Sequence, residues 1–184
     1  FLLEDVKGIV TLENGRYLRS ILKILKSIGQ QPGGKGAYKI RWKVINTKDH
    51  GVPQHRTRWY CVGILADLDD DSFRFPEDIP CPKIESCIVG LPAARPGQDA
   101  STTQFSDSAN FMIQKAITEI QKLGDYPSTT PYIVDIDAAR SKLNFRVSPC
   151  KTRSRFCGHY ITSLQRRMSI PEMMRLQGMH PDDL

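Results

Sequence analysis

Apolar residues along the first third of the chain recur with the spacing of β-strands. Residues 1–6 form a mostly apolar run, typical of a buried strand, and residues 58–65 form a nearly continuous one, typical of a central strand. Between these runs, Ile40, Trp42 and Val44 alternate with basic residues, which predicts a half-exposed strand. With one helix between the first two strands, this succession predicts an α/β fold.

Three helices are predicted from apolar spacing and end signals. The first is capped by Asn14, ends at Gly29 and has its apolar positions on one face: Leu18, Ile21, Leu22, Leu25 and Ile28. A second is predicted at residues 108–123, directly before a glycine. A third opens with a capping box formed by Ser169 and Glu172.

The middle of the chain has a different character. From residue 67, three consecutive aspartates and several prolines leave little regular structure, which indicates a chain leaving its first domain. Short strands are predicted at residues 132–136 and around residues 145–147.

Charge is unevenly distributed along the chain, whose net charge is +6. Residues 14–66 carry eleven Lys or Arg against one acid, residues 67–139 carry five bases against thirteen acids, and residues 140–171 carry eight bases and no acid. A polyanion such as nucleic acid would meet the two basic blocks. An unevenly charged, solvated surface explains the same pattern equally well.

Cysteine usage and hydropathy narrow the class of protein. The five cysteines are odd in number and include no C-x-x-C pair, which argues against a zinc knuckle and a disulfide scaffold. We therefore expect no metal and a reducing, intracellular setting, either a nucleus or a bacterial or phage-infected cytoplasm. No apolar run approaches the roughly 20 residues that span a bilayer, so we expect no membrane partner. Because the sequence begins at Phe1 without a methionine, we expect a piece of a longer protein.

Two short stretches carry candidate chemistry in the first domain. Glu4 and Asp5 stand near the carboxyl end of the first strand, where ligands bind in open α/β sheets. Gln54, Arg56 and Arg58 stand where a polar turn enters the third strand, and the two arginines project to the same side of an extended chain. An acid capping a turn and a solvated strand start are the plainer alternatives.

A third candidate stretch lies in the last basic block. Cations and hydroxyls alternate there and aromatic residues follow, a combination suited to phosphate contacts and base stacking. We expect nucleic acid to be bound by Lys151, Thr152, Arg153, Arg155, His159, Tyr160 and Arg167. A loop that is merely exposed would have a similar composition.

Taken in order, three motifs resemble those of the C5 cytosine-specific DNA methyltransferase family. Residues 3–8 (LEDVKG) are similar to its Glu-Asn-Val motif, and residues 51–63 (GVPQHRTRWYCVG) to its Gln-x-Arg-x-Arg motif. Residues 166–178 (RRMSIPEMMRLQG) are similar to its motif ending in Arg-Leu-Gln-Gly. The resemblance covers both ends of the chain, and the segment between matches only as a variable insert.

The resemblance implies a role for each matching residue. These enzymes flip a cytosine out of duplex DNA, attack its carbon 6 with a cysteine thiolate and methylate carbon 5 from S-adenosyl-L-methionine. Glu4 matches the carboxyl group that polarises the ring at nitrogen 3, and Arg58 matches the arginine that contacts the base carbonyl. Arg56 and Gln54 match positions that steady the backbone and the active-site loop. We group Arg56 with the catalytic residues Glu4 and Arg58. We expect structural support also from Asp5 and Glu172.

Some family features are replaced or missing. Asp5 stands where the family has Asn, a like charge beside the catalytic carboxylate. The family's Pro-Cys nucleophile and glycine-rich donor loop lie upstream of its Glu-Asn-Val motif, and neither occurs here. The dipeptides ending in Cys81 and Cys150 lie downstream and are read as coincidental. We therefore expect this chain alone to be inactive, with the cofactor bound mainly by sequence outside it.

The resemblance implies a fold class and a domain order. We expect the distal part of a Rossmann-like S-adenosylmethionine-dependent methyltransferase domain at residues 1–66. A mostly irregular, β-containing target recognition domain follows at residues 67–162, and a return helix at residues 163–184. The expected partner is double-stranded DNA. A transfer-RNA methyltransferase of the same family and a non-catalytic nucleic-acid-binding paralogue remain the alternatives.

Overall fold

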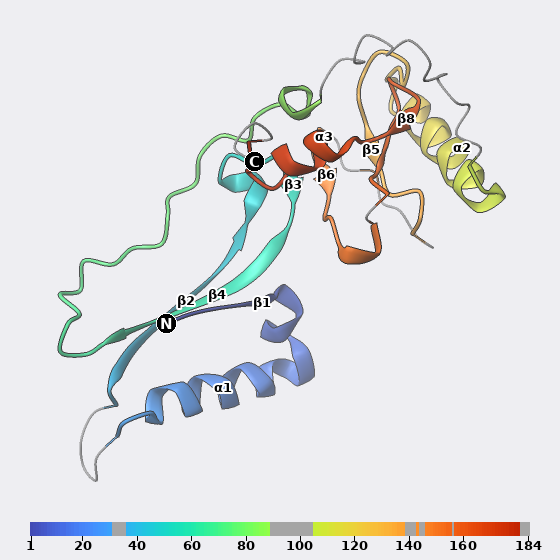
Figure 1. The fold of residues 1–184 in the computed structure, drawn as a ribbon. Coiled ribbons are helices and arrows are strands. Elements are labelled where there is room, and N and C mark those ends of the chain that lie inside the picture. Colours follow the sequence, from blue (N-terminus) through green and yellow to red (C-terminus); the bar gives the residue numbers. More distant parts are fainter. Residues whose placement is uncertain (31–35, 89–104, 139–142, 144–145, 156, 181–184) are drawn as a thin grey trace. The chain divides into compact units, whose positions relative to one another are not determined.

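The computed structural model describes residues 1–30, 36–88, 105–138, 143, 146–155 and 157–180 (Figure 1). The chain forms two compact units. The first comprises Phe1–His50 and Thr57–Ile79, and the second comprises Gly51–Arg56 and Pro80–Leu184. The short segment Gly51–Arg56 therefore belongs to the second unit, although strands of the first unit precede and follow it in the sequence.

A three-stranded sheet forms the centre of the first unit. Its order is β1 (Leu2–Val6), β4 (Thr57–Leu65) and β2 (Tyr38–Asn46), and both neighbouring pairs are antiparallel. The prediction that residues 58–65 form the central strand is confirmed. The prediction that the first strand is buried is wrong, because β1 is an edge strand in the described sheet and all five of its residues are exposed.

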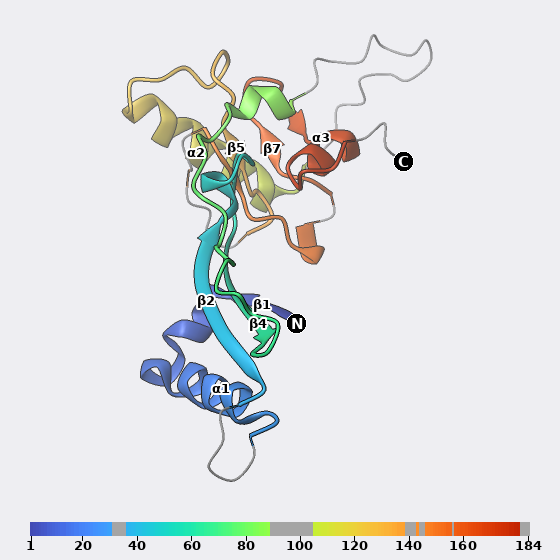
Figure 2. The same ribbon diagram turned by 90° about the vertical axis from the view of Figure 1, so that its left-hand side faces the viewer.

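Helix α1 (Arg16–Ser27) packs on one face of this sheet (Figure 2). The expected cap at Asn14 is wrong: Asn14 has a left-handed backbone with φ of 54°, and Gly15 occupies the N-cap position. The predicted end is confirmed by Gly29, whose φ of 69° favours glycine. Leu18 of α1 packs against Trp59 and Cys61 of β4 to form the core of this unit.

Short helical turns and an ion-pair network complete the first unit. The 3-10 turns are Lys7–Val10, Leu12–Gly15 and Thr47–Asp49. The acidic turn after β4 folds back onto β2, where Arg41 contacts Asp69 at 2.6 Å and Asp71 at 2.7 Å, and Lys39 contacts Asp71 at 2.9 Å. The aspartates that suggested a chain leaving its domain therefore hold the turn against the sheet.

The second unit is built from helix α2 (Asp107–Lys122) and a small antiparallel sheet. The sheet has the order β5 (Ile133–Val134), β7 (Tyr160–Ile161) and β8 (Arg166–Arg167). The apolar face of α2 packs on this sheet and on the residues after β5. The predicted helix is confirmed within one residue at each end, and β5 confirms part of the strand predicted at residues 132–136.

A further parallel strand pair and the last helix belong to this unit. Strand β3 (Gln54–His55) pairs in parallel with β6 (Ser148–Pro149). A strand was predicted around residues 145–147. Residue 145 lies outside the described residues, and the observed strand β6 begins directly after residue 147. The helix α3 (Ile170–Arg175) begins with the predicted capping box and packs near the turn Ile84–Cys87. A last 3-10 turn is formed by Arg153–Arg155.

Candidate functional site

Glu4 and Arg58 meet on one face of the first unit's sheet. In the antiparallel register Glu4 lies opposite Tyr60 and Arg58 lies opposite Val6, so the two side chains are diagonal neighbours. The Nε atom of Arg58 lies 3.2 Å from Oε1 of Glu4. The Glu4 side chain is 42% exposed and that of Arg58 is 15% exposed, so the carboxylate stays accessible while the guanidinium is held by the sheet.

The Arg58 guanidinium has a second anchor in its own strand. Its Nη1 atom donates a hydrogen bond to the Thr57 carbonyl at 2.9 Å. A guanidinium is planar and stays charged at all working pH values, so it is suited to polarising a carbonyl oxygen. A carboxylate beside it can accept or donate a proton. The pair thus places an acidic group and a fixed cation side by side on one face of the sheet.

Asp5 lies on the opposite face of β1 from Glu4, because neighbouring residues in a strand alternate faces. Its Oδ1 atom accepts a hydrogen bond from the backbone N–H of Val6 at 2.6 Å. This contact favours the plainer interpretation of Asp5, an acid that caps the turn after the strand. The alternation also separates its charge from Glu4 across the sheet.

Gln54 and Arg56 belong to the second unit, in the segment that contains β3. Gln54 is buried and pairs with Ser148 of β6. Arg56 is half-buried, and its Nη1 atom lies 3.8 Å from the Sγ atom of Cys150, which directly follows β6. Both residues are thus held by contacts with the later part of the variable insert, which suits the supporting roles implied by the resemblance.

Glu172 is completely buried at the start of α3, where several donors surround its carboxylate. Arg166 of β8 donates to both oxygens, at 2.8 and 2.9 Å. Ser169 donates to Oε2 from its backbone N–H at 2.6 Å and from its hydroxyl at 3.0 Å. The bond with Glu172 raises the pKa of the Arg166 guanidinium. Glu172 therefore fastens α3 to β8.

Arg167 also makes close protein contacts, although its side chain remains partly accessible. Its guanidinium contacts both oxygens of Asp137 at 2.7 and 2.8 Å and donates to the Gly158 carbonyl at 2.7 Å. It also lies over the ring of Phe105, 5.7 Å from the centroid. The bond with Asp137 raises the pKa of Arg167. These contacts hold β8 to Asp137, which follows β5, and to Gly158, which precedes β7.

The remaining candidate residues of the last basic block differ in how far their side chains are buried. His159 and Tyr160 are buried at β7, and Nδ1 of His159 lies 3.9 Å from Asp135, which favours packing over base stacking. Thr152 and Arg153 are exposed, and the Thr152 hydroxyl bonds that of Ser154 at 3.1 Å. Lys151 is half-buried, and burial lowers the pKa of its ammonium group.

The side chain of Arg155 lies outside the described residues. Among the predicted nucleic-acid contacts whose side chains are described, Thr152 and Arg153 are exposed, and Lys151 and Arg167 are partly accessible.

Sequence reasoning missed three residues that hold the predicted ones in place: Arg166, Asp137 and Cys150. Arg166 had a usable signal, because a capping-box glutamate that is also buried requires a cation nearby. Asp137 and Cys150 had none, since their partners Arg167 and Arg56 lie 30 and 94 residues away.

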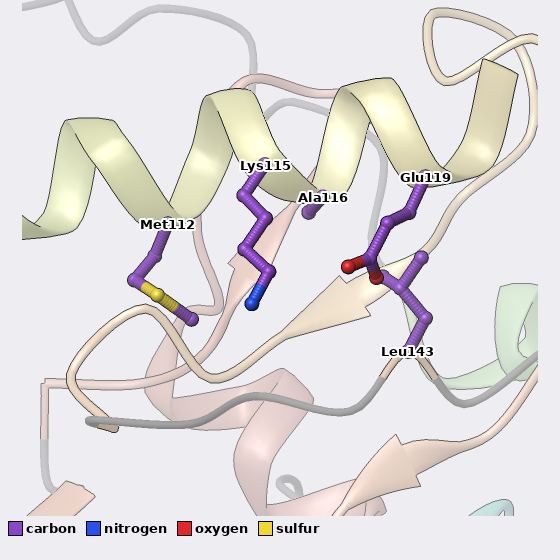
Figure 3. A pocket seen from close by; sticks show the side chains of 5 residues that line it. All are labelled: Met112, Lys115, Ala116, Glu119 and Leu143. Atoms are coloured by element: carbon purple, nitrogen blue, oxygen red, sulfur yellow. The ribbon is translucent and has the colours of Figure 1, made fainter. Parts of the chain in front are cut away.

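Other parts of the described chain offer little room for a ligand. A shallow hollow beside α2 is lined by Met112, Lys115, Ala116, Glu119 and Leu143 (Figure 3). Among the described residues, no three His, Cys, Asp or Glu side chains form a group that could hold a metal ion. No helix in the described ranges is long and apolar enough to cross a membrane.

Comparison with known proteins places the chain in a family. The family model described as C-5 cytosine-specific DNA methylase matches residues 1–183. Type II methyltransferase M.NgoBI of Neisseria gonorrhoeae is 32% identical over all 184 residues, which span 50% of that protein. Type II methyltransferase M.HaeII of Haemophilus aegyptius is 32% identical over 182 residues, 99% of this chain and 50% of that one. The chain thus spans about half the length of these relatives.

A solved structure shares the fold. A crystal structure described as a DNA modification methyltransferase encoded within an E. coli prophage superposes with a TM-score of 0.55 at 16% identity. The match covers 98% of this chain and 59% of that one, which shows a common methyltransferase fold. On the match of its family model to nearly every residue, the chain belongs to the C-5 cytosine-specific DNA methylase family.

Proposed function

We propose that the protein containing residues 1–184 is a DNA (cytosine-5-)-methyltransferase that flips its target cytosine and methylates carbon 5. Family membership and the type II methyltransferases among its relatives support this activity. The observation that carries the proposal is the contact between Glu4 and Arg58 on the accessible face of the sheet. The two residues come from separate motifs and meet in the arrangement that the reaction needs.

Glu4 acts on the ring of the flipped base. Attack of a thiolate on carbon 6 places negative charge in the pyrimidine, and a carboxyl group at nitrogen 3 and the exocyclic amine stabilises it by sharing a proton. The Glu4 side chain is accessible enough to meet such a base. Its contact with Arg58 keeps it oriented before the base arrives.

Arg58 binds the carbonyl oxygen of the same base. Its guanidinium is fixed between the Glu4 carboxylate and the Thr57 carbonyl, so little rotamer freedom is lost when the base is bound. We propose that Arg56 and Gln54 steady the segment that carries them, which β6 and Cys150 contact.

The second unit supplies DNA recognition. We propose residues 67–162 as the target recognition domain, although residues 67–79 pack with the first unit, and residues 163–184 as the return helix toward a catalytic domain that includes residues 1–66. Lys151, Thr152, Arg153 and Arg155 contact phosphates, which fix the register of the protein on the duplex. His159, Tyr160 and Arg167 shape this surface through the packing and ion pairs of β7 and β8.

The methyl group comes from S-adenosyl-L-methionine, the donor used by the family. The sequence has no glycine-rich donor loop in residues 1–184, and the glycines of residues 30–37 lack the spacing of one. We therefore propose that the cofactor is bound mainly by parts of the protein outside residues 1–184.

Transfer of a labelled methyl group to DNA tests the proposal. Purified protein that contains residues 1–184 is incubated with double-stranded DNA and the donor, and bisulfite sequencing locates 5-methylcytosine. Methylation at one recurring sequence is expected. Methylation of transfer RNA in its place, or tight DNA binding without any transfer, would favour one of the two alternatives and overturn the proposal.

A further inference from the structure

The segment carrying Arg56 is aligned by a strand that lies almost one hundred residues further along the chain. Gln54 and His55 pair with Ser148 and Pro149, and the backbone N–H of Ser148 donates to the Pro53 carbonyl at 2.7 Å. Gln54 and Ser148 are both buried. This pairing fixes the backbone on which Arg56 is mounted, and contacts of the long Arg56 side chain then set the position of its guanidinium.

Cys150 contacts the Arg56 side chain directly. The Cys150 thiol donates to the Lys151 carbonyl at 3.5 Å, which turns the sulfur lone pairs toward other donors. The Nη1 atom of Arg56 donates to this sulfur at 3.8 Å, a length suited to a sulfur acceptor. The thiol therefore contacts both the Arg56 guanidinium and Lys151, the first residue of the basic segment 151–155.

We propose that Cys150 is a positioning residue that fixes the Arg56 guanidinium and links it to the basic segment that contacts DNA. This inference rests on the proposed function. The Pro-Cys dipeptide ending in Cys150 lies in the wrong place for the family's nucleophile, and the contact with Arg56 gives its thiol a different task. DNA bound by Lys151, Thr152 and Arg153 would thereby hold the chain that positions Arg56.

Three variants separate positioning from packing. Cys150→Val keeps the size of the side chain but removes its hydrogen bonds, whereas Cys150→Ser keeps a group that can accept from Arg56 and donate to Lys151. Cys81→Val is the matched control at an exposed thiol in the same unit. Each is made in the protein that contains residues 1–184, and thermal unfolding compares their stability.

A small misplacement of a supporting group can lower a rate by up to about 10²-fold. We expect Cys150→Val to lower the single-turnover methylation rate by about tenfold and the affinity for DNA by less than about twofold. Cys150→Ser should restore most of the rate, and Cys81→Val should match the wild type. A fluorescent adenine analogue at the target position should report less base flipping in Cys150→Val.

Dependence on Arg56 supplies the decisive comparison. If Cys150 acts through Arg56, Cys150→Val has no further effect on the rate in an Arg56→Ala background. An equal loss in both backgrounds, or a Cys150→Val rate equal to that of the wild type, would overturn the inference. If Cys150→Val does not fold, the same comparison is made with Cys150→Ala. Absence of methylation by the wild-type protein would overturn the proposed function itself, which distinguishes the two failures.

Discussion

Two carboxylate–guanidinium pairs in this chain differ in how completely they are enclosed. Glu4 is 42% exposed and its oxygen lies 3.2 Å from Arg58. Glu172 is fully buried, and both of its oxygens bond Arg166 at 2.8 and 2.9 Å while Ser169 adds two further donors. The same residue types thus form an accessible pair in the first unit and an enclosed one in the second.

The difference in exposure distinguishes a carboxylate suited to catalysis from one suited to a structural role. A carboxylate that binds a substrate must have accessible oxygens. The cation beside it must stay in position when the carboxylate turns from that cation to the substrate. A carboxylate enclosed by donors cannot be reached by a substrate, and removing it leaves a partly buried cation without a counter-charge. We therefore expect a change at Glu4 to affect the rate and a change at Glu172 to affect stability.

The largest expected effect follows from Glu4→Gln. This variant keeps the size of the side chain but cannot donate the proton or carry the charge of the carboxyl group. We expect the methylation rate to fall by about 10²- to 10⁴-fold with DNA affinity little changed. Single-turnover kinetics and DNA titration measure the two quantities, and Glu13→Gln in an exposed turn of the same unit serves as control. An unchanged rate would refute the role of Glu4.

The next largest effect is expected from Glu172→Gln, which should lower stability where Glu4→Gln lowers the methylation rate. The variant removes the charge that Arg166 and Ser169 surround, so we expect the free energy of unfolding to fall by about 3 kcal/mol. Chemical denaturation measures this loss, and Glu85→Gln on an exposed turn provides the matched control. If Glu172→Gln lowers the free energy of unfolding no more than Glu85→Gln does, the buried pair does not fasten α3 to β8.

A smaller effect is expected from Arg153→Ala combined with Arg155→Ala. Loss of two phosphate contacts should reduce the slope of log affinity against log salt by about 2. The control combines Lys23→Ala with Lys26→Ala, two exposed bases on α1. If the Arg153→Ala, Arg155→Ala variant has the same slope as the wild type, these arginines do not contact DNA phosphates.

The smallest effect concerns the acidic turn of the first unit. The hydrogen bond from Arg41 holds the pKa of Asp69 below its ordinary value. A carboxyl group with a depressed folded-state pKa stabilises the fold above its unfolded pKa of about 4 and loses that contribution as pH falls through the folded value. Asp69→Asn should therefore lose less stability than the wild type on acidification below about pH 4, measured by thermal unfolding. Identical acid profiles would contradict this.

Local signals predicted the regular elements well. The apolar run of β4, the spacing of α2 and the capping box of α3 each lie within one short stretch, so the sequence alone carries them. The strands β3, β6, β7 and β8 have two residues each. β8 forms a short hairpin with β7, whereas β3 pairs with β6 and β7 pairs with β5 across long stretches of sequence. Pairing of that kind leaves no periodicity in the sequence.

The candidate site follows the same division. Strand alternation predicted that Arg56 and Arg58 share a side of an extended chain, but the two residues fall in different compact units. The contact of Glu4 with Arg58 depends on the register between β1 and β4, which joins residues more than fifty positions apart. Motif resemblance identified both residues, whereas their contact required the fold.

A double-mutant cycle tests most directly the claim that Glu4 and Arg58 act as one unit on the base. Single-turnover methylation rates are measured for the wild type, Glu4→Gln, Arg58→Ala and the double variant. Residues that act together have non-additive effects, so we predict that the double variant is about as slow as the slower single variant. A double variant slowed by the product of the two single effects would contradict a shared role.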